Sequence, residues 1–490
     1  MNIELQVLGS ALRSVAEEMG AVLVRSSFSA NIKERRDCST ALFDPDVRMV
    51  VQAEHIPVHL GAMPEAVAAV RARDPAPGDV FIVNDPYAGG THLPDITLVS
   101  RTQLGFAVSR AHHADVGGAE PGSMPALSHT LAEEGVVIPP SRLDDDLLAA
   151  LLAQMRNPDE RRGDLRAQLA AQRLAERRVA ELCARRGRDH VAAAMRQLLA
   201  YSERRVRAGI AALPDGRYEA ADVLEAADQE LEIRAAVTIA GDELEVDFAG
   251  THGQHDGNLN CPLAVTRSAV YFVVRCLTDP DVLASGGAYA PVTIRCPEGS
   301  LVNARPPAAV AAGNVETSCR IVDVLFRAFA QATEVPAQGQ GTMNNLTFGN
   351  DRFTYYETVG GGQGACPQAD GPSGVHVTMS NTLNTPVEAL ELAYPLRVER
   401  YALRLGSGGS GRFRGGDGVV RALRMLEACR FSVVGERRTH APQGERGGEP
   451  GLPGRNLLNG EELAAKATRD LAPGDVVTIM TPGGGGFGLR

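Results

Sequence analysis

Two short stretches of the sequence, which begin at His92 and His112, repeat the pattern His-x-x-Asp. Each stretch offers an imidazole and a carboxylate, and these are donors that Zn²⁺, Mn²⁺ and Fe²⁺ accept in proteins. Together, His92, Asp95, His112 and Asp115 supply enough donors for one divalent cation. The pattern therefore predicts a metal centre. The alternative from the residues alone is that these side chains only cap loops and form local hydrogen bonds.

The elements around the two motifs favour the metal centre. Residues 96–100 and 106–110 alternate in polarity or are apolar, and a turn around Gly105 separates them, which predicts a β-hairpin. Asp95 precedes the first predicted strand and His112 follows the second. Because opposite residues of an antiparallel pair have Cα atoms about 4.5–5.5 Å apart, the open end of the hairpin brings both motifs together.

Four further residues are candidates around this centre. Asp85 lies in a glycine-rich loop, where it could act as a fifth ligand or hold a ligand in place. His113 is either a ligand or a proton carrier, because neighbours in an extended segment point to opposite sides. His59 could line the pocket, although a structural role is favoured. Glu134 could be a general base for a metal-bound water, although a carboxylate at a helix start is favoured.

Several other chemistries have little support in the sequence. Residues 406–411 match G-x-G-x-x-G, but the glycine-rich residues 412–418 cannot form the helix that a dinucleotide site needs. Neither lysine, Lys33 or Lys466, stands in the Gly-Lys-Ser/Thr context of a P-loop. The sequence has no G-x-S-x-G motif, and Cys319 and Cys366 have no basic neighbour, so nucleophilic catalysis is not expected.

The composition is that of a globular protein, with 44% hydrophobic and 22% charged residues. The formal net charge is −11 and no dense basic stretch occurs, so no nucleic-acid binding is expected. No window of 18 uninterrupted apolar residues predicts a membrane span, and charged residues interrupt the first 26 positions where a signal peptide would lie. The eight scattered cysteines lack a Cys-x-x-Cys motif, which favours reduced thiols in the cytoplasm.

The 490 residues are too many for one ordinary core, so several subdomains are expected. The predicted class is mixed α+β, with a helical insertion and a β-rich, glycine-rich C-terminal part. The predicted units are an N-terminal metal-site domain (1–140), a helical subdomain (141–215), an α/β subdomain (216–337) and a β-rich subdomain (338–490). The glycine runs at 360–364 and 483–486 indicate loops where the backbone passes close to another group.

Long stretches of the sequence, in order and nearly from end to end, resemble the hydantoinase B/oxoprolinase family. The matching stretches are Asn31–Ser39, His55–Met63, Asn84–Asp95, His112–Gly118, Gly313–Ser318, Gly341–Leu346, Tyr356–Thr358, Asn384–Glu391 and Thr481–Gly488.

The resemblance implies a division of labour between two subunits. A hydantoinase A-type partner with an actin-like ATPase fold would bind ATP and Mg²⁺ and phosphorylate the amide oxygen of a hydantoin, 5-oxoproline or lactam. In the B-type subunit, water activated by one divalent metal (Mn²⁺, Zn²⁺ or Fe²⁺) would then attack. The expected complex is a heterotetramer or larger. The family's metal is carried over to His92, Asp95, His112 and Asp115 only.

Two other functions stay open at this point. Related acetone and acetophenone carboxylases use the corresponding subunit for carbon–carbon bond formation, so the chain could belong to an ATP-dependent carboxylase. A third possibility is a subunit without chemistry of its own, which only completes the partner's site.

Overall fold

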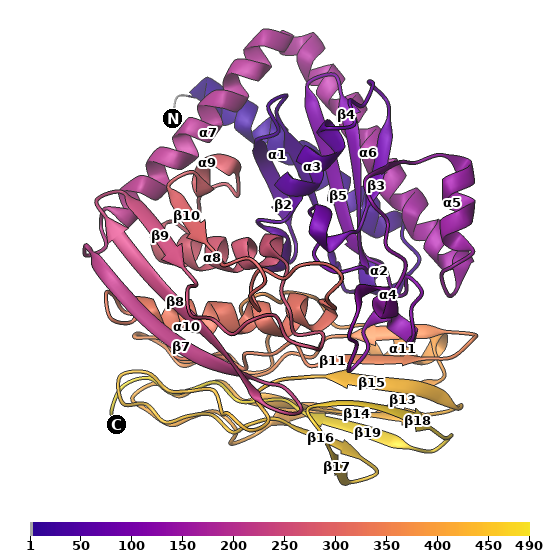
Figure 1. Cartoon of the computed structure of the whole chain (residues 1–490), viewed down its shortest axis with the longest axis vertical. Coiled ribbons are helices and arrows are strands. Elements are labelled where there is room, and N and C mark those ends of the chain that lie inside the picture. Colours follow the sequence, from indigo (N-terminus) through magenta and orange to yellow (C-terminus); the bar gives the residue numbers. More distant parts are fainter. Residues whose placement is uncertain (1–2) are drawn as a thin grey trace.

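Four β-sheets and the helices between them make up residues 3–490, the part of the chain that the computed structural model describes (Figure 1). The predicted mixed α and β class is confirmed. None of the described helices is both long and apolar enough to cross a bilayer. The eight cysteines are free thiols, as their scattered positions predicted.

A six-stranded sheet carries the predicted metal motifs. Its strands, in spatial order, are β2 (Met49–Glu54), β1 (Cys38–Phe43), β5 (Gly105–His112), β4 (Asp95–Thr102), β3 (Val80–Val83) and β6 (Ser141–Arg142). β4 and β5 form the predicted hairpin, but both strands are longer than expected and include the ligand candidates Asp95 and His112, which pair directly. All residues of β5 are buried, because the sheet is covered on both faces.

Three long helices, α1 (Ile3–Ser26), α6 (Pro158–Arg186) and α7 (Arg188–Ile210), pack together on this sheet (Figure 1). In α1 the apolar residues recur every three or four positions, which gives the helix one apolar stripe. Alanines of α6 face this stripe and share a core with it and with β1 and β5. The predicted helical segment 141–215 therefore packs on the metal-site sheet, and its boundaries as a separate unit stay a prediction.

The ends of α6 follow from its sequence. Pro158 occupies the first turn, where its missing N–H costs nothing, and Asp159 and Glu160 follow it. Arg185 and Arg186 lie in the last turn, so charges of both signs complement the helix dipole. Gly187, with φ of 84°, ends the helix in a conformation that glycine adopts at little cost.

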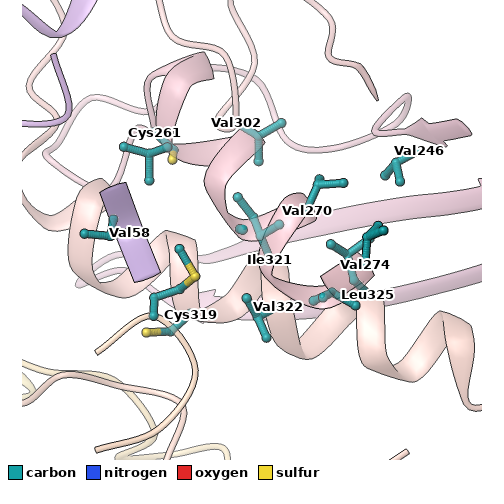
Figure 2. Close-up of a cluster of buried hydrophobic side chains, with 14 of the residues drawn as sticks. Val58, Val246, Cys261, Val270, Val274, Val302, Cys319, Ile321, Val322 and Leu325 are labelled. Carbon is teal, nitrogen blue, oxygen red and sulfur yellow. The ribbon is translucent and has the colours of Figure 1, made fainter. Parts of the chain in front are cut away.

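A second sheet contains β10 (Val292–Arg295), β9 (Glu243–Asp247), β8 (Glu230–Ala240) and β7 (Gly216–Glu225), in this order. Two helices, α8 (Leu263–Thr278) and α10 (Ser318–Phe329), pack against each other and against this sheet. Figure 2 shows Val270 and Val274 of α8 beside Ile321 and Leu325 of α10. Each such buried aliphatic side chain contributes about 1.5–3 kcal/mol.

The C-terminal part is a sandwich of two sheets that share one core. One sheet contains β12 (Thr354–Glu357), β11 (Asn345–Gly349), β15 (Cys429–Val434) and β18 (Lys466–Leu471). The other contains β13 (Leu396–Arg404), β14 (Gly418–Met425), β19 (Val476–Met480), β16 (Arg455–Leu458) and β17 (Glu461–Leu463). Apolar residues such as Phe348 and Ile479 fill the space between them.

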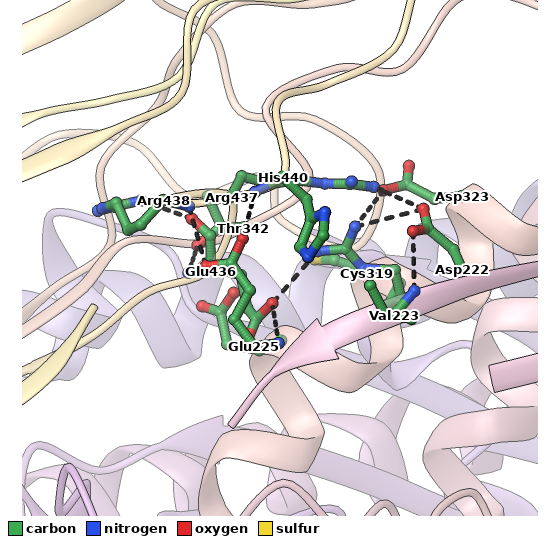
Figure 3. Close-up of polar contacts among 12 residues, drawn as sticks. Asp222, Val223, Glu225, Cys319, Asp323, Thr342, Glu436, Arg437, Arg438 and His440 are labelled. Atoms are coloured by element: carbon green, nitrogen blue, oxygen red, sulfur yellow. Dashed lines mark hydrogen bonds and ion pairs between the residues drawn. The ribbon is translucent and has the colours of Figure 1, made fainter. Parts of the chain in front are cut away.

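Buried charges join this sandwich to the second sheet (Figure 3). Arg437 donates to Asp222 of β7 at 2.9 Å and to Asp323 of α10 at 2.5 Å. Glu225, at the end of β7, accepts backbone N–H groups from the segment that follows Arg437. Because these partners come from three separate stretches, the network fixes how the C-terminal part sits on the rest of the chain.

Five glycine-rich extended segments lie against one another beside the sandwich. They cover residues 360–364, 371–374, 406–418, 443–451 and 481–488. Their backbones exchange hydrogen bonds, as from Gly362 N to Pro482 O at 3.0 Å and from Gly409 N to Gly484 O at 2.8 Å. A Cβ atom on Gly415 would lie 2.0 Å from the carbonyl oxygen of Gly484. The prediction of close backbone approach at these glycine runs is confirmed. We call this region the glycine array.

The remaining elements are short. They are α2 (Ala30–Lys33), η1 (Pro57–His59), α3 (Met63–Arg71), η2 (Pro86–Ala88), η3 (Pro121–Ser123), α4 (Leu131–Glu134), α5 (Asp145–Leu152), α9 (Gly286–Tyr289), the π-helical turn η4 (Gly313–Thr317) and α11 (Val387–Ala393).

Candidate metal centre

His92, Asp95 and His112 form a buried triangle at the open end of the β4–β5 hairpin. Asp95 Oδ1 lies 3.2 Å from His92 Nε2 and 3.1 Å from His112 Nδ1. The two ring nitrogens are themselves 3.1 Å apart. Donors bound at 2.0–2.1 Å to a tetrahedral metal lie roughly 3.3–3.4 Å from one another. The triangle therefore matches one face of such a coordination shell.

The triangle is not satisfied as a hydrogen-bond network of the protein alone. Both nitrogens compete for the same oxygen of Asp95, and two nitrogens facing each other share at most one proton. Within the described residues, the opposite ring nitrogens, His92 Nδ1 and His112 Nε2, are buried without a hydrogen-bond partner. Such groups cost free energy unless another species completes them. The residues present fit a divalent cation.

The electrostatics of the triangle favour metal-ready protonation states. Burial would raise the pKa of Asp95, but attraction to His92 and hydrogen bonds from His112 and His59 outweigh it and hold that pKa well below its usual range. Burial lowers the pKa of His112 to about 4, only partly opposed by Asp95. At neutral pH the site therefore presents an ionised carboxylate and a neutral imidazole, the forms that bind cations.

The second oxygen of Asp95 is held by protein groups. Thr91 Oγ1 donates to Asp95 Oδ2 at 2.5 Å, and His59 Nε2 lies 3.4 Å from the same oxygen. His59 Nδ1 is in turn 3.0 Å from Ser39 Oγ. These contacts turn Oδ1 toward the triangle, so the structure brings the pocket candidate His59 to the centre as a residue that positions a ligand.

Sequence reasoning missed Asp37. This residue precedes β1, and its carbonyl oxygen accepts the backbone N–H of His112 at 3.0 Å. Its buried carboxyl feels the charges of Asp95, His59 and His92, and burial, followed by repulsion from Asp95, raises its pKa to about 6. A cation would relieve that repulsion, so Asp37 is a candidate fourth donor. The only signal in the sequence was its place inside a stretch that matches the family.

Asp115 does not join the triangle. Its Oδ1 accepts Gly117 N at 2.7 Å, and its Oδ2 accepts Gly122 N at 2.7 Å and Arg156 Nη1 at 3.2 Å. The physical reason is that β5 ends at His112, so three residues further on the chain has left the sheet. The second His-x-x-Asp motif thus contributes its histidine to the triangle, and its aspartate stabilises a loop.

His113 also points away from the triangle. Its Nε2 lies 2.9 Å from Gln168 Oε1 on α6, and burial lowers the pKa of its ring to about 4. The predicted alternation of neighbouring side chains accounts for this placement, because His112 and His113 leave the strand in opposite directions. The structure does not bring His113 to the triangle.

The last two predicted residues occupy different places. Glu134 is buried, accepts Ser128 Oγ at 2.8 Å and Ala311 N at 2.9 Å, and has its pKa raised to about 7 by burial. Its charge still reaches His92, whose pKa it helps to raise, although burial acts in the opposite sense. Asp85 instead caps η2 by accepting Tyr87 N at 2.9 Å, and it lies outside the triangle.

Comparison with known sequences gives a consistent result. An Arabidopsis thaliana protein named 5-oxoprolinase 1 is 38% identical over 99% of this chain, and the chain spans 42% of that protein's length. A Pseudomonas sp. protein, provisionally named as the B-type subunit of a D-/L-hydantoinase, is 32% identical over 99% of this chain and 90% of its own length.

Solved structures agree with the sequence comparison. The ATP-dependent caprolactamase from Pseudomonas jessenii superposes with a TM-score of 0.92 at 29% identity, covering 99% of this chain and 91% of that one. An acetone carboxylase superposes with a TM-score of 0.89 at 18% identity, covering 99% and 75%, and shares the fold. The family model described as hydantoinase B/oxoprolinase matches residues 1–490, and the chain belongs to that family.

Proposed function

We propose that this chain is the ring-opening subunit of an ATP-dependent cyclic-amide hydrolase acting on a hydantoin, 5-oxoproline or a lactam. The observation that carries the proposal is the buried triangle of His92, Asp95 and His112 in a member of this family. The similarity to a caprolactamase supports the reaction class. An A-type partner that binds ATP and Mg²⁺ completes the enzyme, as the name of the Pseudomonas relative suggests.

Phosphorylation solves the main chemical problem of this reaction. Amide resonance keeps the carbonyl carbon electron-rich, and transfer of a phosphoryl group from ATP to the amide oxygen ends that resonance. The oxygen of one water then bonds to the carbon, and the ring C–N bond breaks with its electron pair and a proton going to nitrogen. A second water displaces phosphate from the resulting acyl phosphate, which leaves a carboxylate.

The chain's own residues would position this chemistry. We propose His92, Asp95 and His112, with Asp37 as fourth donor, as ligands of one Mn²⁺, Zn²⁺ or Fe²⁺ ion. When bound, such a metal lowers the pKa of water toward neutrality and polarises a substrate oxygen. His59 and Thr91 orient Asp95.

Among the predicted proton carriers, Glu134 is the better candidate. It is buried and its charge reaches His92, whereas His113 faces α6. We therefore propose that Glu134 holds the proton that water releases.

The test uses the chain purified together with its A-type partner. Ring opening should require ATP, and His112→Ala should lower the bound metal and reduce the rate at least hundredfold. His190→Ala, on the exposed surface of α7, serves as the control and should keep both. Full activity with His112→Ala would reject the metal assignment.

The same preparations decide the two alternatives. Bicarbonate-dependent product formation from a ketone, without ring opening, would assign the chain to a carboxylase, with which it shares a fold. Absence of bound metal after gentle purification would favour a subunit that only completes the partner's site.

A further inference from the structure

Arg35 is a fully buried cation that lacks an anionic partner. Its Nη2 donates to Thr358 Oγ1 at 2.5 Å, to the Thr358 carbonyl at 3.2 Å and to Thr382 Oγ1 at 2.9 Å. Its Nε and Nη1 have no hydrogen-bond partner among the described residues. The side chain is 0% exposed, so water at the surface does not reach these two donors.

The other fully buried arginines are satisfied differently. Arg161, Arg320 and Arg437 each have a carboxylate oxygen within 4 Å. Arg110 has none within the described residues, but its Nε donates to Thr97 and its Nη2 to Gly89, which leaves one free nitrogen. Arg35 is therefore the buried arginine with neither an ion pair nor more than one engaged nitrogen.

An unpaired buried guanidinium is costly. Arginine stays protonated in proteins, so it cannot relieve the cost by losing its charge. Burying an unpaired ion costs several kcal/mol even after the protein relaxes. A chain that keeps such a group dry gains free energy when an anion joins it, and the two free N–H groups of Arg35 show where that anion would bind.

Arg35 lies beside the proposed metal centre. Its positive charge contributes to lowering the pKa of His112, after the larger effect of burial. It also acts on Asp37, two residues along the chain, and on Tyr356, whose ring stacks on that of His112 at 4.6 Å. The free donors and the triangle therefore belong to one continuous polar region.

Other donors surround the free face of Arg35. Thr358 and Thr382 are buried, and their hydroxyls lie 2.8 Å apart. His376 Nε2 lies 3.3 Å from Thr382 Oγ1. A guanidinium, two hydroxyls and an imidazole make a set that suits a tetrahedral oxyanion, because Arg presents parallel N–H groups that match phosphate oxygens.

We propose that Arg35, with Thr358 and Thr382, binds the phosphoryl group of the activated substrate while the reacting carbon lies at the metal centre. The identity of this substrate rests on the proposed function. Arg35 holds the phosphoryl oxygens through ring opening. When the C–O bond of the acyl phosphate breaks, the electron pair goes to phosphate, and Arg35 stabilises the anion that leaves.

The test measures binding of inorganic phosphate to the full chain by calorimetry, without turnover, before and after chelation of metal. Arg35→Gln should weaken phosphate binding at least tenfold in both states and leave the metal content unchanged. Arg36→Gln changes the exposed neighbouring arginine and should bind phosphate like the wild type. Acetate should compete weakly, because a planar carboxylate fills the site less completely.

Two results would overturn the inference. One is equal phosphate affinity in wild type and Arg35→Gln, and the other is phosphate binding that chelation abolishes in the wild type. If Arg35→Gln does not fold, Arg35→Lys keeps the charge without the fork, and weaker phosphate binding with normal metal content supports the proposal. Metal content that falls together with phosphate binding in that variant contradicts it.

These outcomes are separate from the fate of the proposed function. Loss of phosphate binding in Arg35→Gln without any ATP-dependent ring opening would leave the anion site standing and reject the reaction. Ring opening that needs ATP and His112, with phosphate binding indifferent to Arg35, would do the reverse.

Discussion

The two carboxylate oxygens of Asp95 have different tasks. Oδ1 faces His92 and His112, and Oδ2 is held by Thr91 and His59. An amide in place of this carboxylate would keep the size of the side chain but remove its charge, and its NH₂ group would meet donors. The charge of one residue thus organises the whole triangle.

A pair of isosteric substitutions separates the two aspartates of the repeated motif. Asp95→Asn should lower metal affinity at least hundredfold, whereas Asp115→Asn should keep the metal and lose stability, because Asp115 accepts two backbone N–H groups and Arg156. Equilibrium dialysis with metal analysis and urea unfolding measure the two effects. Loss of metal in Asp115→Asn alone would contradict the assignment.

Glu316, in the π-helical turn η4, should make stability depend on pH. Burial, and then repulsion from Glu436, raise its pKa from 4.5 to about 7 in the folded chain. Between these values the folded state binds more protons than the unfolded state. This contribution to the free energy of unfolding is therefore complete below pH 4.5 and is lost as the pH rises through 7.

Glu316→Gln should remove that dependence. The amide oxygen can still accept Met343 N and Asn345 Nδ2, which Glu316 Oε1 accepts at 3.2 and 2.8 Å. Relative to the wild type, the variant should gain stability between pH 5 and pH 8 in urea unfolding. Glu461→Gln, at an exposed position of β17, is the control. Parallel profiles for wild type and Glu316→Gln would contradict the expectation.

The residues that could be predicted are those close together in sequence. His92, Asp95 and His112 are linked by one hairpin, so local pattern was enough to associate them. Asp37 and Arg35 reach the centre through pairing of β1 with β5, about 70 residues apart in sequence, and no local pattern specifies such pairing. Asp115 was misplaced because the motif repeat says nothing about where the strand ends.

At the scale of elements, two glutamines of α6 hold the hairpin that carries the triangle. Gln168 Nε2 donates to Ile96 O at 3.0 Å, and its Oε1 faces His113. Gln172, one turn later, donates to Leu98 O at 2.9 Å and accepts Ser100 Oγ. Both are buried, so the helix grips β4 through hydrogen bonds as well as through apolar contacts.

Gln168→Leu should be destabilising by roughly 1–3 kcal/mol, because it leaves buried groups without partners. Urea unfolding measures this loss. Metal affinity should fall less than in Asp95→Asn, since the ligands themselves remain. Gln154→Leu, at an exposed position before α6, controls for the change of residue type and should lie within about 0.5 kcal/mol of the wild type.

At the scale of the whole molecule, a bound metal would tie together the ends of β1, β4 and β5. A ligand that binds only the folded state adds about 2.7 kcal/mol at a hundredfold excess over Kd. Chelation should therefore lower the melting temperature, and metal should restore it. The same treatment should have no effect on His112→Ala, and an equal shift in that variant would show that the metal binds elsewhere.

The glycine array should tolerate no side chain at its centre. Gly415→Ala brings a Cβ to 2.0 Å from a backbone oxygen, so the segments must separate and lose hydrogen bonds. We expect a lower melting temperature and higher susceptibility to protease in this part. Gly253→Ala meets nothing within 4 Å and should be neutral or slightly stabilising. Equal behaviour of the two variants would contradict the packing argument.

The glycine array also has a consequence for how the chain reaches its native state. Its strands of backbone come from positions spread between 360 and 488, and each has hydrogen-bond partners only when the others are present. Glycine gives up more conformational freedom than any other residue and offers no apolar side chain to start a collapse. The order of events is set by this: sheets and helices gather first, and the main-chain layer closes last, once its neighbours already hold every segment in place.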